Sequence, residues 1–346
     1  MNYFLRKLLF VSVTLLSTYG IGLSQNTNHD SHHIRERSSI PVQHFDLQIS
    51  EILSVQPVGD YYVIVHRNRH GVSVMNNAGE LKTHLGNIGR GPFEWLRPMF
   101  IQYLNGEIAI WDAGNLKFII YDEDYEPVRE EYGIQYSIRG FNRNATDWVA
   151  VYDQPGNQKE FVYIYEKDAN GRFSVKKSIG AISDEGRIKL FSEMIGGVLW
   201  NGNDLLWVDP AVPGFSVFDP EENDIREFIL DDDLFSVDPW DEPQQMSQRV
   251  FSKIEGYLFS NSRIVSLQKL NDHILIEVEH FPMGQPVIRY HIFDLSYSYV
   301  MQLEAGDGGW MNYIRGVNGN KLYYWGDNYM ETGQNSRIRV REVVID

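Results

Sequence analysis

The chain has 346 residues, no cysteine, and 47 acidic against 31 basic side chains, which gives a net charge of −16. Such an acidic surface repels phosphate backbones and anionic lipid, so we expect neither nucleic acid nor a membrane surface as a partner. The lack of cysteine excludes a disulfide framework and a cysteine-linked lipid anchor. The apolar core alone must therefore hold the fold together.

Residues 1–24 show the three zones of a secretory signal peptide. Arg6 and Lys7 form the basic start, "LLFVSVTLL" is the apolar stretch, and Gly22 and Ser24 precede the cleavage site. The apolar stretch is shorter than the ~20 residues that span a bilayer. We therefore predict an exported protein, periplasmic or extracellular, that is not a lipoprotein and has no membrane span in its mature chain.

The rest of the chain divides into a short leader and one long domain. Residues 25–40 are polar and lack apolar periodicity, so we predict a flexible leader. Residues 41–346 contain six similar segments, each with a Gly/Asn/Asp turn, a run of strand-forming residues, a polar loop and a second such run, the pattern of a β-hairpin. The six copies begin at Gly59, Asn105, Thr146, Gly202, Asn271 and Gly319.

The spacing of these hairpins predicts the fold class. Between copies there is enough chain for two further strands, so each unit has four strands at a period of roughly fifty residues. This period predicts an all-β, six-bladed β-propeller with four-stranded antiparallel blades. A two-sheet sandwich remains an alternative, and the best helical candidate is "MSQRVFSKIEGYLF", residues 246–259.

Both ends of the domain bear on how the ring closes. The final "RIRVREVVID" leaves the last blade one strand short, while "IPVQHFDLQ", from Ile40, has no blade of its own. We expect the N-terminal strand to pair with the C-terminal blade, because that pairing completes the sheet and covers two exposed edges.

The Gly-rich stretch "GNIGRGPFEWLRP", residues 86–98, could be a phosphate cradle or a corner of the chain. A P-loop needs Gly-Lys-Ser/Thr, and a dinucleotide loop needs a third glycine in register followed by a helix; both are missing. We therefore predict a structural corner, in which glycines permit positive φ and Phe93 or Trp95 fills the gap between sheets.

Together with the strands that follow, "LGNIGRGPFEWLRPMFIQYLNGEIAIWD" resembles the connector and first strands of NHL-type repeats. More closely, it is similar to the NHL-like six-bladed β-propeller family of exported Bacteroidota proteins. In that family a Gly-x-x-Gly-x-Gly-Pro-x-Glu-Phe-like corner joins one blade to the next; here Phe93 and Glu94 stand in the reverse order. The resemblance implies an exported propeller.

Motifs for catalysis and metal binding are scarce. The chain has no Gly-x-Ser-x-Gly and no His-Glu-x-x-His, and the expected inner strands contain no histidine. His280 and His291 could meet across a hairpin, but we favour ordinary strand histidines. The acidic stretches 231–243 and 122–126 lack the spaced pattern of a calcium loop. We therefore predict no cofactor and keep calcium or another divalent cation as the alternative.

Four arginines form the candidate ligand site. Arg97 and Arg263 each stand eight residues before the hairpin turn of their own unit, at Asn105 and Asn271. When the units are aligned on these turns, Arg139 falls two places after that position and Arg315 falls four places after it. Without a bulge, these offsets put all four on one strand face. Facing the channel, they would bind a carboxylate, a sulfate or a uronic acid. The alternative is that each pairs with an acidic residue between blades.

These observations predict an exported, non-enzymatic binding or interaction propeller that acts as a monomer. Its unknown partner, a small anionic ligand or an envelope protein, engages one rim of the central channel. One alternative is a divalent-cation-dependent lyase or lactonase with its site at the channel mouth. Another is a sensory or assembly partner of an outer-membrane complex.

Overall fold

The computed structural model describes residues 33–41, 52–67, 71–134, 138–146, 148–153, 160–192, 197–240, 253–254, 256–258, 260–282, 286–305, 314–326 and 337–345. All of them belong to one compact unit, His32–Ile345. The predicted signal peptide, residues 1–24, and the first part of the predicted leader lie outside the described residues. Within those ranges, no helix combines the length and the hydropathy that a membrane span requires.

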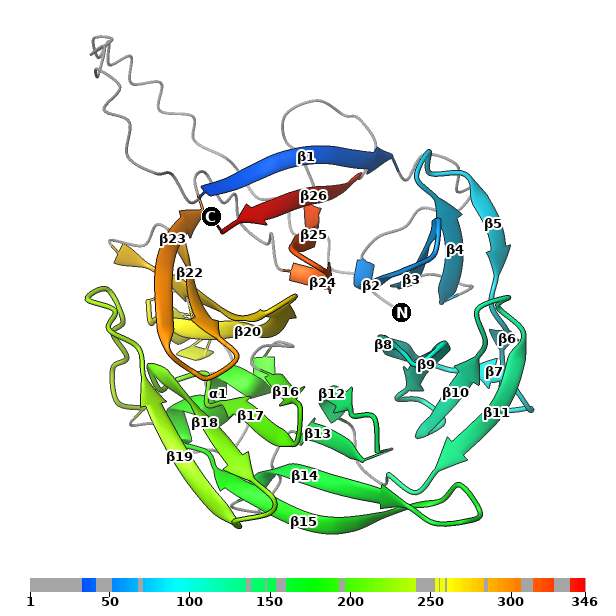
Figure 1. Ribbon diagram of the computed structural model, residues 1–346, viewed down its shortest axis with the longest axis horizontal. Coiled ribbons are helices and arrows are strands. Elements are labelled where there is room, and N and C mark those ends of the chain that lie inside the picture. Colours follow the sequence, from blue (N-terminus) through cyan, green and yellow to red (C-terminus); the bar gives the residue numbers. More distant parts are fainter. Residues whose placement is uncertain are drawn as a thin grey trace, which may run out of the picture. The chain divides into compact units, whose positions relative to one another are not determined.

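The described residues form six four-stranded antiparallel sheets, which confirms the predicted six-bladed propeller. In Figure 1 the sheets stand radially around a common centre, with the first strand of each blade nearest the middle. The first two blades consist of β2 (Ile52–Val58), β3 (Tyr61–His66), β4 (Val72–Asn76) and β5 (Leu81–His84), then β8 (Pro98–Leu104), β9 (Glu107–Asp112), β10 (Lys117–Tyr121) and β11 (Pro127–Tyr132).

The next three blades follow the same plan, each built from four strands that are consecutive in the chain. They consist of β12 (Ile138–Arg143), β13 (Val149–Asp153), β14 (Glu160–Lys167) and β15 (Phe173–Ala181), then β16 (Gly197–Asn201), β17 (Asp204–Val208), β18 (Gly214–Asp219) and β19 (Asp224–Ile229), then β20 (Arg263–Leu270), β21 (His273–His280), β22 (Val287–Asp294) and β23 (Tyr299–Ala305).

The sixth blade closes the ring with both ends of the domain. Its strands are β24 (Ile314–Asn318), β25 (Lys321–Gly326), β26 (Arg337–Val344) and, on the outside, β1 (His33–Pro41). β1 pairs antiparallel with β26 along its length, from His33 with Val344 to Pro41 with Arg337. Closure by an N-terminal strand is therefore confirmed.

The position of the closing strand needs a correction. We expected "IPVQHFDLQ" to supply it and residues 25–40 to be a flexible leader, but β1 begins at His33 and takes only Ile40 and Pro41 from the expected stretch. The outer strand of a blade needs backbone partners more than apolar side chains, because much of it faces solvent. The polar composition of residues 33–40 was therefore a poor guide.

Apolar side chains fill the spaces between neighbouring blades. One cluster runs through the first three blades and includes the fully buried Val74 on β4, Trp111 on β9 and Val151 on β13. Each sheet covers its apolar faces only by packing against the next, as expected of radial sheets.

Two small elements lie in the connections. β6 (Asn87–Ile88) and β7 (Glu94–Trp95) form a short parallel pair in the Gly-rich corner. The helix α1 (Asp184–Ser192) precedes β16, and its N-terminus is capped by Ser183 Oγ, which accepts a hydrogen bond from the Gly186 amide at 2.9 Å. Sequence analysis missed this helix. Its best helical candidate, residues 246–259, lies mostly outside the described residues, and the described part of it, residues 253–254 and 256–258, is helical.

Candidate functional site

A cavity of about 780 Å³ lies where the inner strands meet. Its walls come from β2, β8, β12, β16, β20 and β24 and from the turns that follow several of them. Each inner strand contacts its two neighbours around the ring, so the cavity is the central channel of the propeller (Figure 1). The volume falls in the usual range for small-molecule sites.

The charged side chains of this channel share one sign. Among the described residues that line it, the ionic side chains are all cationic and none is Asp or Glu. They are Arg139, Arg143, Lys269 and Arg315. In a chain with a net charge of −16, such a lining makes the channel a locally positive region.

Backbone irregularities position two of these cations. The pairing of β12 with β13 shifts register between Ile138 and Gly140, and the pairing of β24 with β25 shifts between Ile314 and Gly316. Arg139 and Arg315 are therefore the extra residues of two β-bulges, which leave a residue out of the ladder and redirect its side chain.

Arg139 and Arg315 come from opposite walls. β12 and β24 are the inner strands of the third and sixth blades, and Figure 1 shows them on opposite sides of the ring. Because both bulges lie near the beginning of their strands, the two guanidinium groups belong to the same end of the channel. This arrangement could hold one anionic group between two cationic walls.

The structure does not bring Arg97 and Arg263 to that place. Arg263 is 0% exposed, and its Nε and Nη2 both lie 2.7 Å from Glu279 Oε2. Arg97 is exposed and precedes β8. The shared-face expectation required strands without bulges, but β8 and β20 both contain one, after Pro98 and Ile264. A bulge shifts the alternation of side chains by one residue.

Sequence analysis missed the other two channel cations, which lie near the hairpin ends of their strands. Arg143 Nη1 lies 3.6 Å from Glu131 Oε2, and the same buried carboxylate contacts Arg129 Nε at 2.9 Å and Lys167 Nζ at 3.1 Å. Lys269 is exposed, with Nζ 3.4 Å from Asn201 Oδ1. Their place in the sequence, just before the hairpin turn at which an inner strand reaches the channel rim, could have identified them as channel residues.

Two amides in the channel wall join blades. Gln102 Nε2 donates to the Arg143 carbonyl at 3.1 Å, and Gln102 Oε1 accepts from the Arg143 amide at 2.7 Å. Asn142 Oδ1 accepts from the Trp200 amide at 3.0 Å. These bonds connect the inner strands of the second, third and fourth blades, so Arg139 stands on a wall that its neighbours hold in place.

The Gly-rich corner is filled by protein atoms, as predicted. Trp95 is fully buried, and its Nε1 donates to the Leu85 carbonyl at 2.7 Å. Gly86 has φ 63°, and a Cβ there would lie 2.4 Å from Trp95 Nε1. Glu94 Oε2 accepts from the Gly91 amide at 2.6 Å, so the loop amide that a phosphate would need is already bonded.

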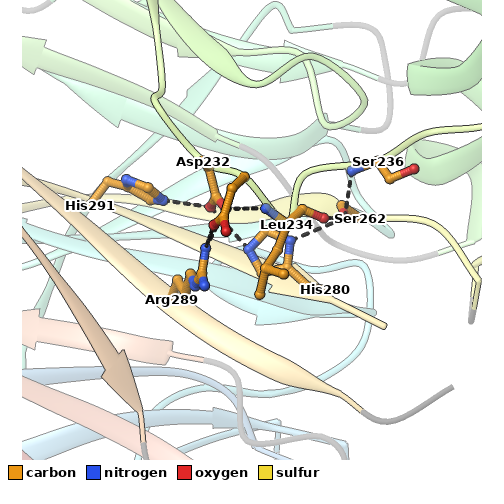
Figure 2. Close-up of polar contacts among 8 residues, drawn as sticks. Asp232, Leu234, Ser236, Ser262, His280, Arg289 and His291 are labelled. Carbon is orange, nitrogen blue, oxygen red and sulfur yellow. Dashed lines mark hydrogen bonds and ion pairs between the residues drawn. The ribbon is translucent and has the colours of Figure 1, made fainter. Parts of the chain in front are cut away.

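A second polar cluster surrounds the buried Asp232, after β19 (Figure 2). Asp232 Oδ2 lies 2.8 Å from His291 Nε2 and 3.0 Å from His280 Nε2, while Oδ1 lies 2.7 Å from Arg289 Nη1. His280 and His291 thus meet, but at a carboxylate from another blade rather than as cross-strand partners.

The Asp232 cluster contains a Ser–His–Asp sequence of contacts, since His280 Nδ1 lies 3.1 Å from Ser262 Oγ. A catalytic triad needs a hydroxyl that reaches substrate. Ser262 is only 3% exposed, its Oγ donates to the Leu234 carbonyl and accepts from the Ser236 amide, and it does not line the channel. The cluster fastens the segment after β19 to the fifth blade.

The charges of this cluster balance one another. Burial lowers the pKa of both His280 and His291. Burial alone would raise the pKa of Asp232, but the neighbouring His280 and His291 hold it below its usual value.

Acidic groups suggested for calcium have structural partners. Asp122 Oδ1 accepts from the amides of Asp124 at 3.0 Å and Glu126 at 2.9 Å, which caps a tight turn. In the part of the chain that the structure describes, no three His, Asp or Glu residues are placed to hold a metal ion. No described ligand set therefore supports the divalent-cation alternative.

The fold and channel define the class as a six-bladed β-propeller, and comparison with known proteins agrees. A family model, DUF5128, described as a 6-bladed beta-propeller, matches residues 25–133. A Bacteroides fragilis protein described as exported is 11% identical and has a TM-score of 0.60, covering 92% of this chain and 98% of that one.

A DUF4221-family member from Bacteroides vulgatus is 8% identical, with a TM-score of 0.64, covering 90% of this chain and 98% of that one. No curated protein matches. Identities this low show the fold alone, so the finer resemblance to NHL-type repeats stays a prediction.

Proposed function

We propose that this protein is an exported, non-enzymatic binding propeller whose channel receives the anionic group, a carboxylate or sugar acid, of a small ligand. One observation carries the proposal: the ionic side chains in the described channel lining are all cationic, in a chain with a net charge of −16. Guanidinium groups bind carboxylates with two parallel hydrogen bonds, which gives orientation as well as affinity.

The placement of the cations supports a ligand with a defined orientation. Arg139 and Arg315 come from opposite walls near one end of the channel, and Lys269 lies toward the other end. Phe100 and Phe141 contribute partly buried aromatic surface to the wall between them. A sugar acid would place its carboxylate between the guanidinium groups and its ring along these aromatic side chains.

Export is the second part of the proposal. The three-zone pattern of residues 1–24 supports it, as does the similarity to the exported Bacteroides fragilis protein. Mass spectrometry of the protein from the periplasm and culture medium tests it, since a mature chain beginning at Gln25 is expected. An uncleaved chain that stays in the cytoplasm would refute it.

Calorimetric titration with D-glucuronate, and with D-glucose as the uncharged match, tests the binding proposal. We expect the wild-type protein to bind glucuronate in preference to glucose, and the R139A/R315A double variant to bind it at least about tenfold more weakly. R226A is the matched control, because Arg226 lies on the outer strand β19, where it pairs with Asp204 at 3.2 Å. Equal affinity of the double variant and the wild type would overturn the proposal.

A further inference from the structure

The inner strands of the propeller share a ring of side-chain amides. β2, β8, β12, β20 and β24 each begin with a register shift, and each has an amide two residues after the residue at which regular pairing resumes. These residues are Gln56, Gln102, Asn142, Gln268 and Asn318, and all five line the channel. Among the described lining residues, β16 contributes no amide. The recurrence places the five amides at one level of the channel.

Two of these amides connect blades. Gln102 exchanges two hydrogen bonds with the backbone of Arg143, and Asn142 Oδ1 accepts from the Trp200 amide at 3.0 Å. In both cases an amide on one inner strand bonds the backbone of the next inner strand. Gln102 and Asn142 are therefore part of the wall itself.

The other three amides are not used in this way. Gln268 Nε2 donates to Ser266 Oγ at 2.8 Å, and Gln56 Nε2 donates to the Pro57 carbonyl at 3.3 Å, so both bonds stay within one strand. The exposed Asn318 side chain forms no hydrogen bond in the part of the chain that the structure describes. A side-chain amide offers two donors and a carbonyl acceptor, so all three residues keep hydrogen-bonding capacity for a ligand.

A proline explains why Asn318 is not bonded to the next blade. Arg143 stands three residues after regular pairing resumes on β12, and Pro57 stands at the same place on β2, the inner strand next to β24. Proline has no N–H to donate, so Asn318 cannot form the pair of bonds that Gln102 forms with Arg143. Since β20, β24 and β2 are neighbours around the ring, the three remaining amides form one continuous arc, the amide wall. The amide wall consists of Gln268, Asn318 and Gln56.

The opposite part of the channel wall carries aromatic side chains. Phe100, Phe141 and Trp200 line the channel from β8, β12 and β16. In Figure 1 these three strands lie on one side of the ring, and β20, β24 and β2 lie on the other. A channel with amides on one side and aromatic rings on the other suits a sugar, because a pyranose has an apolar C–H face and hydroxyl groups that both donate and accept.

The amide wall lies at a different level from the two arginines of the anion site. Arg315 and Asn318 are three residues apart on β24, which is about 10 Å along the strand. One pyranose ring is shorter than this distance. A uronic acid whose carboxylate lies near Arg315 therefore leaves room for a further sugar beside Asn318.

We propose that the amide wall is a second subsite, which binds the hydroxyl groups of an uncharged sugar. The ligand is then an acidic oligosaccharide, with a uronic acid at the Arg139 and Arg315 end of the channel and a neutral sugar between the amide wall and the aromatic side chains. This inference rests on the proposed function. It adds the class of ligand, a glycan fragment rather than a free sugar acid.

Calorimetric titration with two ligands tests this subsite: D-glucuronate, and the disaccharide in which D-glucuronate is β-1,4-linked to D-glucose. We expect the wild type to bind the disaccharide at least about tenfold more tightly, because the second ring adds hydrogen bonds and packing. The Q56A/Q268A/N318A variant should bind both ligands with the wild-type affinity for glucuronate. Q302A is the matched control, because Gln302 lies on β23, the outer strand of the blade that contains Gln268, and it should keep the wild-type preference.

The outcomes separate this inference from the proposed function. If the wild type binds the two ligands equally, or if the triple variant keeps the preference for the disaccharide, the amide wall is not a subsite while anion binding stands. If the wild type binds neither ligand, the proposed function fails and the subsite fails with it. Glucuronate binding by the triple variant shows that its channel is intact. If that binding is lost, N318A, which truncates an exposed side chain, replaces it: we expect the preference to fall about threefold, and an unchanged preference refutes the subsite.

Discussion

The channel and the Asp232 cluster are both gatherings of ionic side chains, but they balance charge in different ways. In the cluster, one buried carboxylate contacts two imidazoles and a guanidinium. In the channel, the described lining brings cations together around an open cavity with no carboxylate among them. Histidine is a common catalytic residue, but His280 and His291 hold the segment after β19 against the fifth blade. Arg139 and Arg315, at the bulges, belong to the lining of that cavity.

The largest expected effect tests whether the cluster is structural. D232A would leave His280, His291 and Arg289 without their common partner, and we expect unfolding free energy to fall by about 3–5 kcal/mol. Chemical denaturation measures this loss. D233A is the matched control: Asp233 also lies 2.7 Å from Arg289 Nη1, but its side chain is 83% exposed, so we expect a much smaller loss. Equal losses would show that burial does not decide the role of these contacts.

A somewhat smaller effect separates structural arginines from ligand-binding ones. R263A would leave the buried Glu279 without its guanidinium, and we expect a loss of about 3 kcal/mol in unfolding free energy. R139A and R315A remove partly exposed side chains, so each should cost at most about 1 kcal/mol while lowering anion affinity. Chemical denaturation of the three variants measures these losses of unfolding free energy and their order. If R139A and R315A were as destabilising as R263A, pairing between blades would be the better explanation for all of them.

The fold could be predicted from sequence because propeller strands leave local signals. The apolar run 98–104 is strand β8 itself, and the turn residues marked all six hairpins. The sequence signal is weaker for elements whose structure depends on contacts with distant parts of the chain. The outer strand β1 is polar, since it pairs through its backbone, and α1 has only nine residues and no apolar stripe.

The site was harder to predict because register and long-range contacts are not visible in a single sequence. Arg139 and Arg315 came from reasoning that assumed regular strands, yet bulges are what place them on the channel. Arg97 and Arg263 stand two residues before the bulged residues of their own strands, Met99 and Val265, and so fall outside that group. Nothing near His280 or His291 in the sequence indicates Asp232, which lies 48 residues before His280 in the segment that leads out of the previous blade.

The smallest expected effect is a pH dependence that belongs to the cluster and not to the channel. Burial places the pKa of His280 and His291 below that of a histidine in the unfolded chain, about 6.5. As the pH falls through that value, the unfolded chain takes up protons that the folded cluster resists, so unfolding free energy should decline. Denaturation between about pH 7.5 and about pH 5 should therefore show a slope that the H280Q/H291Q variant largely lacks.

His273 provides the control for this slope, because it begins the same strand, β21, but lies outside the cluster and is only partly buried. H273Q should keep the wild-type slope. The lowered pKa of Asp232 adds a further loss at lower pH, which both histidine variants retain in part, so the comparison is made above about pH 5. If H280Q/H291Q kept the wild-type slope of unfolding free energy against pH, the acid sensitivity would belong to other groups. The Asp232 cluster would then be structural but without a pH response. A flat curve in H280Q/H291Q would assign the acid sensitivity of the fifth blade to the two histidines that contact Asp232.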